Sequence, residues 1–267
     1  MPPPPNTSPT PSNPPRQRLP VLGVPIDVLA AGAAATRILD WAAARDSRVV
    51  CLCNVHSVVT AGGNAALHQA LTEADLTLPD GAPVAWMLRR GGAAGQSRVP
   101  GPDLMFDTLA LAAARAVPVF LYGSRVDTLQ HLQLALHGHW PDLLIAGAIS
   151  PPFRPPTAEE IAADVEAINR SGAGIVWVGL GCPKQERWMA DRRGQVQAVM
   201  VGVGAAFDFL AGQTPRAPRW MRERGLEWLH RLASEPRRLA GRYLSTNSRF
   251  VLGALRQLLR GRGSNMP

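Results

Sequence analysis

The chain contains almost no lysine, few cysteines and no long apolar run. Lys184 is its one lysine among 28 basic residues. The three cysteines, Cys51, Cys53 and Cys182, are an odd number without Cys-x-x-Cys spacing, which argues against a disulfide framework and a structural zinc site. Because no window holds 18 uninterrupted apolar residues and no apolar run marks a secretory signal, we expect a cytoplasmic protein without a membrane span.

Several motifs of enzyme chemistry are also missing. There is no Asp-x-Asp for a diphosphate-bound metal, no His-Glu-x-x-His and no Gly-x-Ser-x-Gly, and the six histidines form no ligand-spaced cluster. The Gly-x-Gly-x-x-Gly fingerprint of nicotinamide enzymes is absent too, so a nicotinamide oxidoreductase ranks behind the two interpretations given at the end of this section. These absences predict a protein with no metal site and no cofactor.

What the chain does contain suits one main domain with an addition. Its 267 residues are 46% hydrophobic, which is enough to bury a full core. Residues 1–20 are rich in Pro, Ser, Thr and Asn and predict a disordered tail. Residues 1–213 carry a net charge near −1, whereas residues 214–267 hold twelve arginines against three glutamates, a net +9. We therefore expect a tail (residues 1–20), a main domain (residues 21–213) and a basic C-terminal appendage (residues 214–267).

Short β-rich apolar runs alternate with helical stretches between residues 21 and 213. This alternation predicts a Rossmann-like α/β fold with a mostly parallel sheet flanked by helices. The expected helices cover residues 27–45, 56–70, 103–115 and a stretch begun by a capping box of Thr157 and Glu160. The expected strands cover residues 48–54, 76–79, 118–123, 143–148, 174–181 and 199–204.

The residues after each expected strand are the candidates for ligand binding, because open parallel sheets bind ligands beyond the carboxyl ends of their strands. Gly101 lies in a further glycine-containing loop. The candidates are Asn54, His56, Asp80, Gly81, Gly101, Gly123, Gly181, Pro183, Lys184, Gln185, Glu186 and Asp208.

Three of these loops allow both a functional and a structural interpretation. Pro183 as the first helical residue would leave backbone donors beside Lys184 free for an anion, or the loop is a tight turn with Lys184 in solvent. Asp80 can act as a general base towards a hydroxyl, or form an Asp-Gly turn. Asp208, between two phenylalanines, needs a ligand hydroxyl or an arginine, which includes an internal ion pair. Asp103 favours a structural role at a helix start.

The basic C-terminal segment predicts an amphipathic helix. Apolar residues recur at helical spacing from Phe250 to Leu259, with Arg249, Arg256 and Arg260 on other faces. Such a helix suits an anionic membrane surface, to which each arginine contributes about 1 kcal/mol. Two alternatives are an arginine-rich nucleic-acid binder and a helical hairpin that packs on the main domain.

Six segments, taken in order, resemble the WecG/TagA/CpsF family of bacterial glycosyltransferases (glycosyltransferase family 26). They are NVHSVV (54–59), LPDGAPV (78–84), VPGPDL (99–104), GLGCPKQERWM (179–189), VGVGAAFDFLAG (201–212) and RAPRWMRERGLEWLHRLASEPRRL (216–239). The resemblance implies a Rossmann-like fold of GT-E type with a C-terminal appendage. It also implies inverting, metal-independent transfer of a hexose from a UDP-sugar to a polyprenyl-diphosphate-linked saccharide at the inner face of the plasma membrane.

The resemblance also implies roles for individual residues. Asp80 matches the catalytic base, the GLGCPKQE loop the UDP site, and Arg231, Arg238 and Arg242 the groups that stabilise diphosphate charge. The chain departs from its relatives at Leu52, where a threonine is common, and at Gly241, where a basic residue is expected. The hexose implied is N-acetylmannosamine, its uronic acid or glucose, for teichoic acid or exopolysaccharide. The alternative is a non-catalytic nucleotide-sugar or nucleic-acid binding protein.

Overall fold

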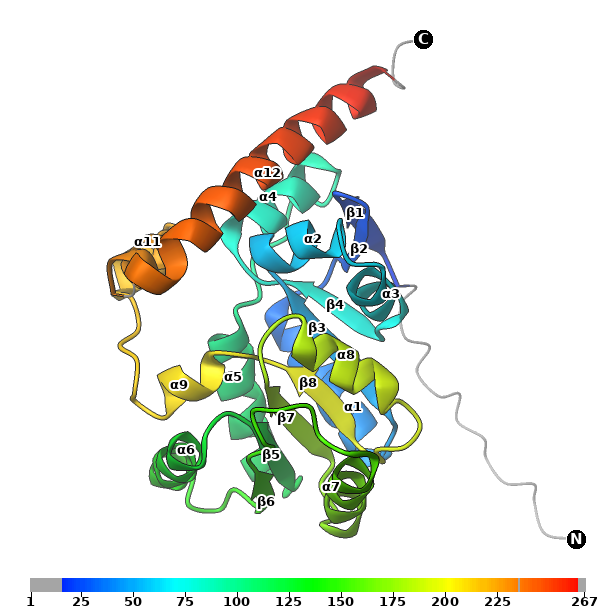
Figure 1. The fold of residues 1–267 in the computed structure, drawn as a ribbon, viewed down its shortest axis with the longest axis vertical. Helices are drawn as coiled ribbons and strands as arrows, with labels where there is room; N and C mark the ends of the chain where they lie inside the picture. Colours follow the sequence, from blue (N-terminus) through cyan, green and yellow to red (C-terminus); the bar gives the residue numbers. More distant parts are fainter. Residues whose placement is uncertain (1–15, 235, 264–267) are drawn as a thin grey trace, which may run out of the picture.

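A parallel six-stranded sheet forms the centre of the protein in the computed structural model, which describes residues 16–234 and 236–263 (Figure 1). The strand order is β4-β3-β8-β7-β5-β6. The predicted Rossmann-like α/β fold is therefore confirmed, and all six expected strands are present. They are β3 (Arg48–Cys53), β4 (Leu76–Pro79), β5 (Val119–Gly123), β6 (Ile145–Ile149), β7 (Ile175–Gly179) and β8 (Val199–Gly202).

Helices cover both faces of the sheet (Figure 1). The expected helix over residues 56–70 is in fact two helices, α2 and α3, and the capping box of Thr157 and Glu160 is present at the start of α7. The helices of the main domain are α1 (Ala31–Ala43), α2 (Val55–Ala61), α3 (Ala65–Glu73), α4 (Ala82–Arg90), α5 (Gly101–Ala114), α6 (Val126–His139), α7 (Ala158–Arg170), α8 (Lys184–Asp191) and α9 (Ala206–Leu210).

The two faces of β3 explain the two-sided core. Cys51 and Cys53 point into one apolar cluster, which α2, α3, α4, α7 and α8 complete. Val50 and Leu52 point into the other, which α1, α5 and α6 complete. Successive side chains alternate across a strand, so a strand buried on both faces is apolar at every position. The predicted core packing of Cys51 and Cys53 is confirmed, since both are fully buried.

A β-hairpin precedes the main sheet. Its strands, β1 (Arg18–Val21) and β2 (Val24–Asp27), pair antiparallel around Leu22 and Gly23, which both have positive φ, as a two-residue hairpin turn requires. The expectation of a disordered tail up to residue 20 is therefore wrong at its end, while residues 1–15 lie outside the described part. The strand begins early because Arg18 reaches the Leu71 and Thr72 carbonyls of α3.

Three helices follow the main domain, namely α10 (Arg219–Glu223), α11 (Glu227–Ser234) and α12 (Pro236–Gly263). Phe250 and Ala254 of α12 are buried in the same cluster as α2. Gln257 donates to the Pro20 carbonyl and accepts from the Leu22 amide, at 2.7 and 2.8 Å, which fastens α12 to the hairpin turn. The expected helix over residues 250–259 is confirmed, and the division of the chain at residue 213 stays a prediction.

Candidate active site

Two polar side chains meet where β3 and β4 end. The strands are adjacent and parallel, so Asn54 and Asp80, each one residue past its strand, lie at the same edge. The Asp80 amide donates to the Cys53 carbonyl at 2.8 Å. Asn54 caps α2 by accepting from the Ser57 amide, and its Nδ2 donates to Oδ2 of Asp80 at 3.4 Å. The Asp80 carboxylate is thus held beside the Asn54 side-chain amide at the carboxyl-terminal edge of the sheet.

The surroundings of Asp80 raise the pKa of its carboxyl group. Its side chain is half-buried, and loss of hydration raises its pKa to about 6. The hydrogen bond from Asn54 opposes this rise, Glu227 adds to it, and the positive charges of Arg98 and Arg231 reduce it. A carboxylate with a pKa close to neutral is well matched to accept a proton at physiological pH.

Gly81 and His56 flank this carboxylate in the chain. Gly81 precedes α4 with φ of +111°, a conformation that favours glycine and turns the chain directly after Asp80. His56 is half-buried on the first turn of α2, with Nδ1 3.4 Å from Oγ1 of Thr60.

The loop between β7 and α8 is held by its own side chains. The Gly181 amide donates to Oε1 of Gln185 at 3.1 Å, and Nε2 of Gln185 donates to Oε1 of Glu186 at 3.0 Å. Both side chains are buried, and burial raises the pKa of the Glu186 carboxyl. The other Glu186 oxygen has no hydrogen-bond partner within the described residues. The side chains of Gln185 and Glu186 therefore lie inside the protein, and Gln185 supports the loop through its contact with the Gly181 amide.

The start of α8 differs slightly from the expectation. Pro183 immediately precedes the helix instead of being its first residue, and Lys184 is exposed. Gly204, after β8, lies against the same loop, since a Cβ added there would be 3.5 Å from Oε1 of Gln185. Gln185 therefore joins the loops that follow β7 and β8.

At the ends of β5 and β7 the backbones of two glycines, Gly123 and Gly179, are in close contact. Gly123 has φ of +122°, and a Cβ added to it would lie 2.6 Å from the carbonyl carbon of Gly179. The chain then reaches Arg125, at the start of α6. Gly101 is also buried, where a Cβ would be 3.1 Å from Cδ1 of Leu52, so its place in the structure is in packing beneath the strand ends.

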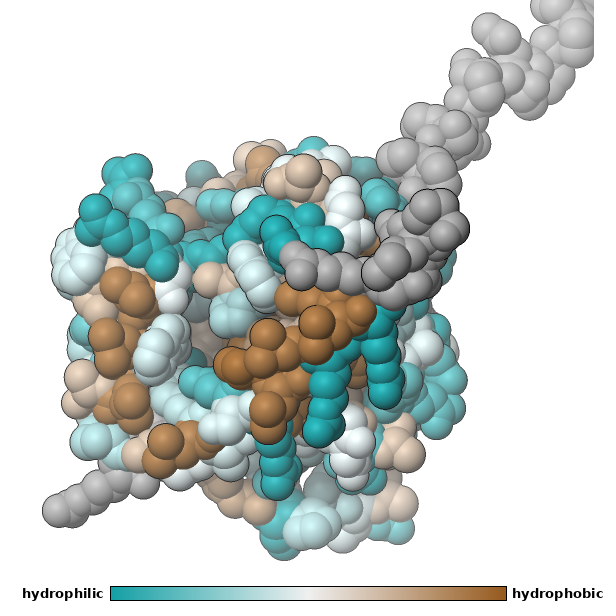
Figure 2. All heavy atoms as spheres, turned by 90° about the horizontal axis from the view of Figure 1, so that it is seen from above, coloured by the Kyte–Doolittle hydropathy of each residue, from teal (hydrophilic) through white to brown (hydrophobic). Residues whose placement is uncertain are grey.

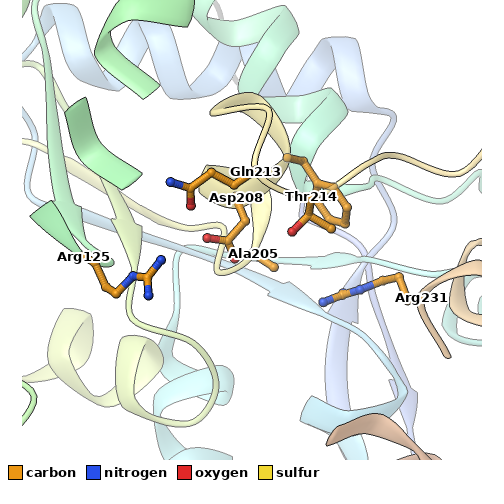
Figure 3. A pocket seen from close by; sticks show the side chains of 7 residues that line it. Arg125, Ala205, Asp208, Gln213, Thr214 and Arg231 are labelled. Carbon is orange, nitrogen blue, oxygen red and sulfur yellow. The ribbon is translucent and has the colours of Figure 1, made fainter. Parts of the chain in front are cut away.

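A pocket of about 460 Å³ lies in front of these strand ends (Figure 3). Arg125 and Arg231 reach towards it from opposite sides, with Asp208 of α9 between them (Figure 3). The guanidinium of Arg231 lies 5.4 Å from the centre of the Phe209 ring, and its Nε is buried with no hydrogen-bond partner within the described residues. The pocket is lined by Arg125, Ala205, Asp208, Phe209, Gln213, Thr214 and Arg231.

The appendage forms one wall of this region. Arg98 pairs with Glu227 at 3.1 Å, and Asp103 pairs with Arg216 at 2.7 Å, so both ion pairs tie the appendage to the main domain. The second pair agrees with a structural role for Asp103. Arg238 and Arg242 lie on α12, but their side chains are outside the described part of the structure.

The structure thus brings most of the predicted residues to one edge of the sheet, and it adds others that the sequence did not suggest. Arg98 and Glu227 lie near Asp80, and Arg125, Gln213 and Thr214 line the pocket. Arg125 follows β5 by only two residues, so its place after a strand was the available signal. Arg98 and Gln213 lie in loops without a distinctive pattern.

The described residues, 16–234 and 236–263, hold no group of three or more His, Cys, Asp or Glu side chains that could bind a metal ion. The family described as Glycosyl transferase WecG/TagA/CpsF matches residues 19–264, nearly the whole chain, which confirms the resemblance. The match covers more than nine tenths of the chain, and the chain therefore belongs to the WecG/TagA/CpsF family of glycosyltransferases.

Proposed function

We propose that this glycosyltransferase moves a hexose from a UDP-sugar to a polyprenyl-diphosphate-linked saccharide in cell-surface polysaccharide synthesis, with inversion and without a metal ion. The observation that carries the proposal is the half-buried Asp80, with its pKa raised to about 6, near a pocket flanked by arginines. The family membership supports transfer of a sugar, and the site suggests how the transfer proceeds.

Asp80 is the proposed general base. Its carboxylate takes the proton from the acceptor hydroxyl while that oxygen bonds to the anomeric carbon and the bond to UDP breaks. Attack opposite the leaving group inverts the configuration in a single displacement. Asn54 orients the carboxylate through its hydrogen bond to Oδ2.

Arginines are the proposed counter-charges of the leaving diphosphate. Arg231 and Arg125 face the pocket from two sides, and guanidinium groups bind phosphate oxygens through paired N–H donors. A cation held in place before the reaction stabilises the negative charge that develops on the leaving group. Arg238 and Arg242 are proposed for the same task. Gly181, where an added Cβ would meet nothing within 4 Å, leaves room for the donor to approach the backbone of the loop after β7.

Replacing Gln185 with alanine is expected to raise the Michaelis constant for the donor about tenfold, because the Gly181 amide loses its partner and the loop loses its support beside Gly204. Steady-state kinetics with varied donor would measure the change. Gln195→Ala removes an exposed glutamine in the turn after α8, the helix that carries Gln185, and serves as the control. An unchanged donor Michaelis constant in the Gln185 variant would argue against a donor site at this loop.

Membrane contact is proposed for the free face of α12. Leu244, Val251, Leu252, Leu255 and Leu259 are each more than half exposed. They lie on one side of the helix, turned away from the buried Phe250 and Ala254. Figure 2 views the molecule from the side of α12 and shows an apolar ridge beside long hydrophilic side chains. Within the described residues, no helix is both long enough and apolar enough to cross a bilayer. A peripheral attachment to anionic lipid fits this face.

Replacing Leu255 and Leu259 together with serine is expected to weaken binding to phosphatidylglycerol vesicles at least tenfold, because each leucine contributes roughly 1.5–3 kcal/mol when fully buried. Sedimentation with vesicles at low and high salt would measure binding. Leu134→Ser, at a leucine of α6 that is more exposed than either, is the control. Equal vesicle binding by wild type and the double variant would contradict the assignment of this face.

The test of the proposed function is acceptor-dependent release of UDP. The purified full chain would be given detergent-dispersed polyprenyl-diphosphate saccharides and a panel of UDP-sugars, with EDTA throughout. We expect release with one donor and acceptor pair. Folded protein that binds UDP-sugars but releases no UDP across the panel would favour a non-catalytic binding protein.

A further inference from the structure

The appendage rests on the loop that carries Asp80. Gly225, in the turn between α10 and α11, has φ of +71°, and a Cβ added to it would lie 2.6 Å from the Cβ of Ala82. Ala82 is the first residue of α4, two positions after Asp80. No other residue type fits this turn without moving the backbone. The start of α11 is therefore fixed against the Asp80 loop.

A largely buried ion pair completes this contact. Glu227, the first residue of α11, accepts from Nη1 of Arg98 at 3.1 Å, and Nη2 of Arg98 donates to the Arg222 carbonyl at 2.6 Å. The side chains of Arg98 and Glu227 are only 20% and 17% exposed. Charges sheltered from water act on their neighbours more strongly than surface charges do. The pair therefore influences the electrostatics of the site as well as holding the appendage.

The charged groups that act on Asp80 come from two elements. Arg98 lies in the loop before α5, and Glu227 and Arg231 lie on α11. Asn54, at the end of β3, supplies the neutral hydrogen bond. The same region holds two histidines, His56 on α2 and His230 on α11.

We propose that Glu227 is a positioning residue for sugar transfer, which holds Arg98 and α11 against the Asp80 loop and sets the balance of charge around that carboxylate. The proposal rests on the role of Asp80 as the base. The ion pair then does more than attach the appendage to the main domain. Glu227 raises the pKa of Asp80 and Arg98 lowers it.

The opposite signs give a distinctive expectation. Without Glu227, the positive charges of Arg98 and Arg231 remain, so Asp80 stays deprotonated to lower pH. Without Arg98, the negative charge of Glu227 is no longer offset, so Asp80 becomes protonated at higher pH. A tether alone predicts that both changes damage activity in the same way.

The experiment is the pH dependence of kcat/KM for UDP release in Glu227→Gln, Arg98→Gln and the double variant. Wild type should lose activity below a midpoint near pH 6. We expect Glu227→Gln to move this midpoint down, and Arg98→Gln to move it up, each by about half a unit or more. The double variant should return close to wild type, and Glu227→Asp, which keeps the charge, should not move it.

Controls separate this role from loss of docking. Asp103→Asn breaks the ion pairs of Asp103 with Arg216 and Arg222, which also hold the appendage, and should leave the midpoint in place. His56→Gln and His230→Gln should also leave it in place, which assigns the midpoint to Asp80. Equal midpoints, or shifts of the same sign, in folded Glu227→Gln and Arg98→Gln would overturn the proposal. Loss of the base role itself would be recognised differently, by an active Asp80→Asn.

Discussion

Replacing Asp80 with asparagine is expected to lower the rate of sugar transfer about 10³-fold, because a positioned general base contributes roughly 10²–10⁴-fold to a rate. Asparagine keeps the size of the side chain and its contact with Asn54, but it cannot accept the proton of the acceptor hydroxyl. The rate of UDP release at saturating donor and acceptor measures the loss. Near-normal transfer by a folded variant would remove Asp80 from the reaction.

The same variant should also change the response to pH, while its fold is retained. The carboxyl of Asp80 has a pKa of about 6, raised from its ordinary value mainly by burial. Wild-type activity should therefore fall as pH drops through 6, and the residual activity of the variant should not. Because the carboxyl pKa is raised from 3.8 to about 6 in the folded protein, ionisation of Asp80 lowers the free energy of unfolding as pH rises between these two values. Asp80→Asn removes that cost, so its melting temperature at pH 8 should match or exceed that of wild type.

Much of the fold was predictable because parallel strands have a strong sequence pattern. β3 is apolar at successive positions since both of its faces are buried, and Asn54 and Asp80 could be placed at one edge because neighbouring parallel strands end together. The hairpin was missed for physical reasons. Its strands are four residues long, each contains a proline, and its turn places Leu22 at positive φ, where Asn, Asp or Gly is the usual signal.

The details of the site depended on contacts between distant residues. Arg98 and Glu227 are 129 positions apart, and no local pattern relates them. Gln185 and Glu186 follow a glycine-rich loop, which suggested direct contact with a ligand, yet both side chains are buried behind that loop. Leu52 is a different case, because the resemblance led us to expect a threonine there. Its side chain is buried beside Gly101, so apolar packing occupies the position of the expected hydroxyl.

Replacing Arg231 with glutamine is expected to lower kcat by about 10²-fold or more, which is typical when a group that stabilises transition-state charge is removed. Arg231 faces the pocket opposite Arg125, and its guanidinium lies over the Phe209 ring. That ring restricts the side chain, so the positive charge is in place before the leaving group departs. Single-turnover measurement of UDP formation would separate the chemical step from donor binding.

Two comparisons distinguish the placement of this charge from its mere presence. Arg249→Gln removes an exposed arginine of α12 and leaves the pocket untouched, so it should change kcat little. Arg231→Lys keeps the charge but loses the planar group that stacks on Phe209 and binds two oxygens at once, so it should recover only part of the rate. An equal loss in the Arg249 and Arg231 variants would show that net positive charge acts through the appendage as a whole. A loss specific to Arg231 would place that charge at the leaving diphosphate, because only a nearby, oriented cation favours the transition state over the bound donor.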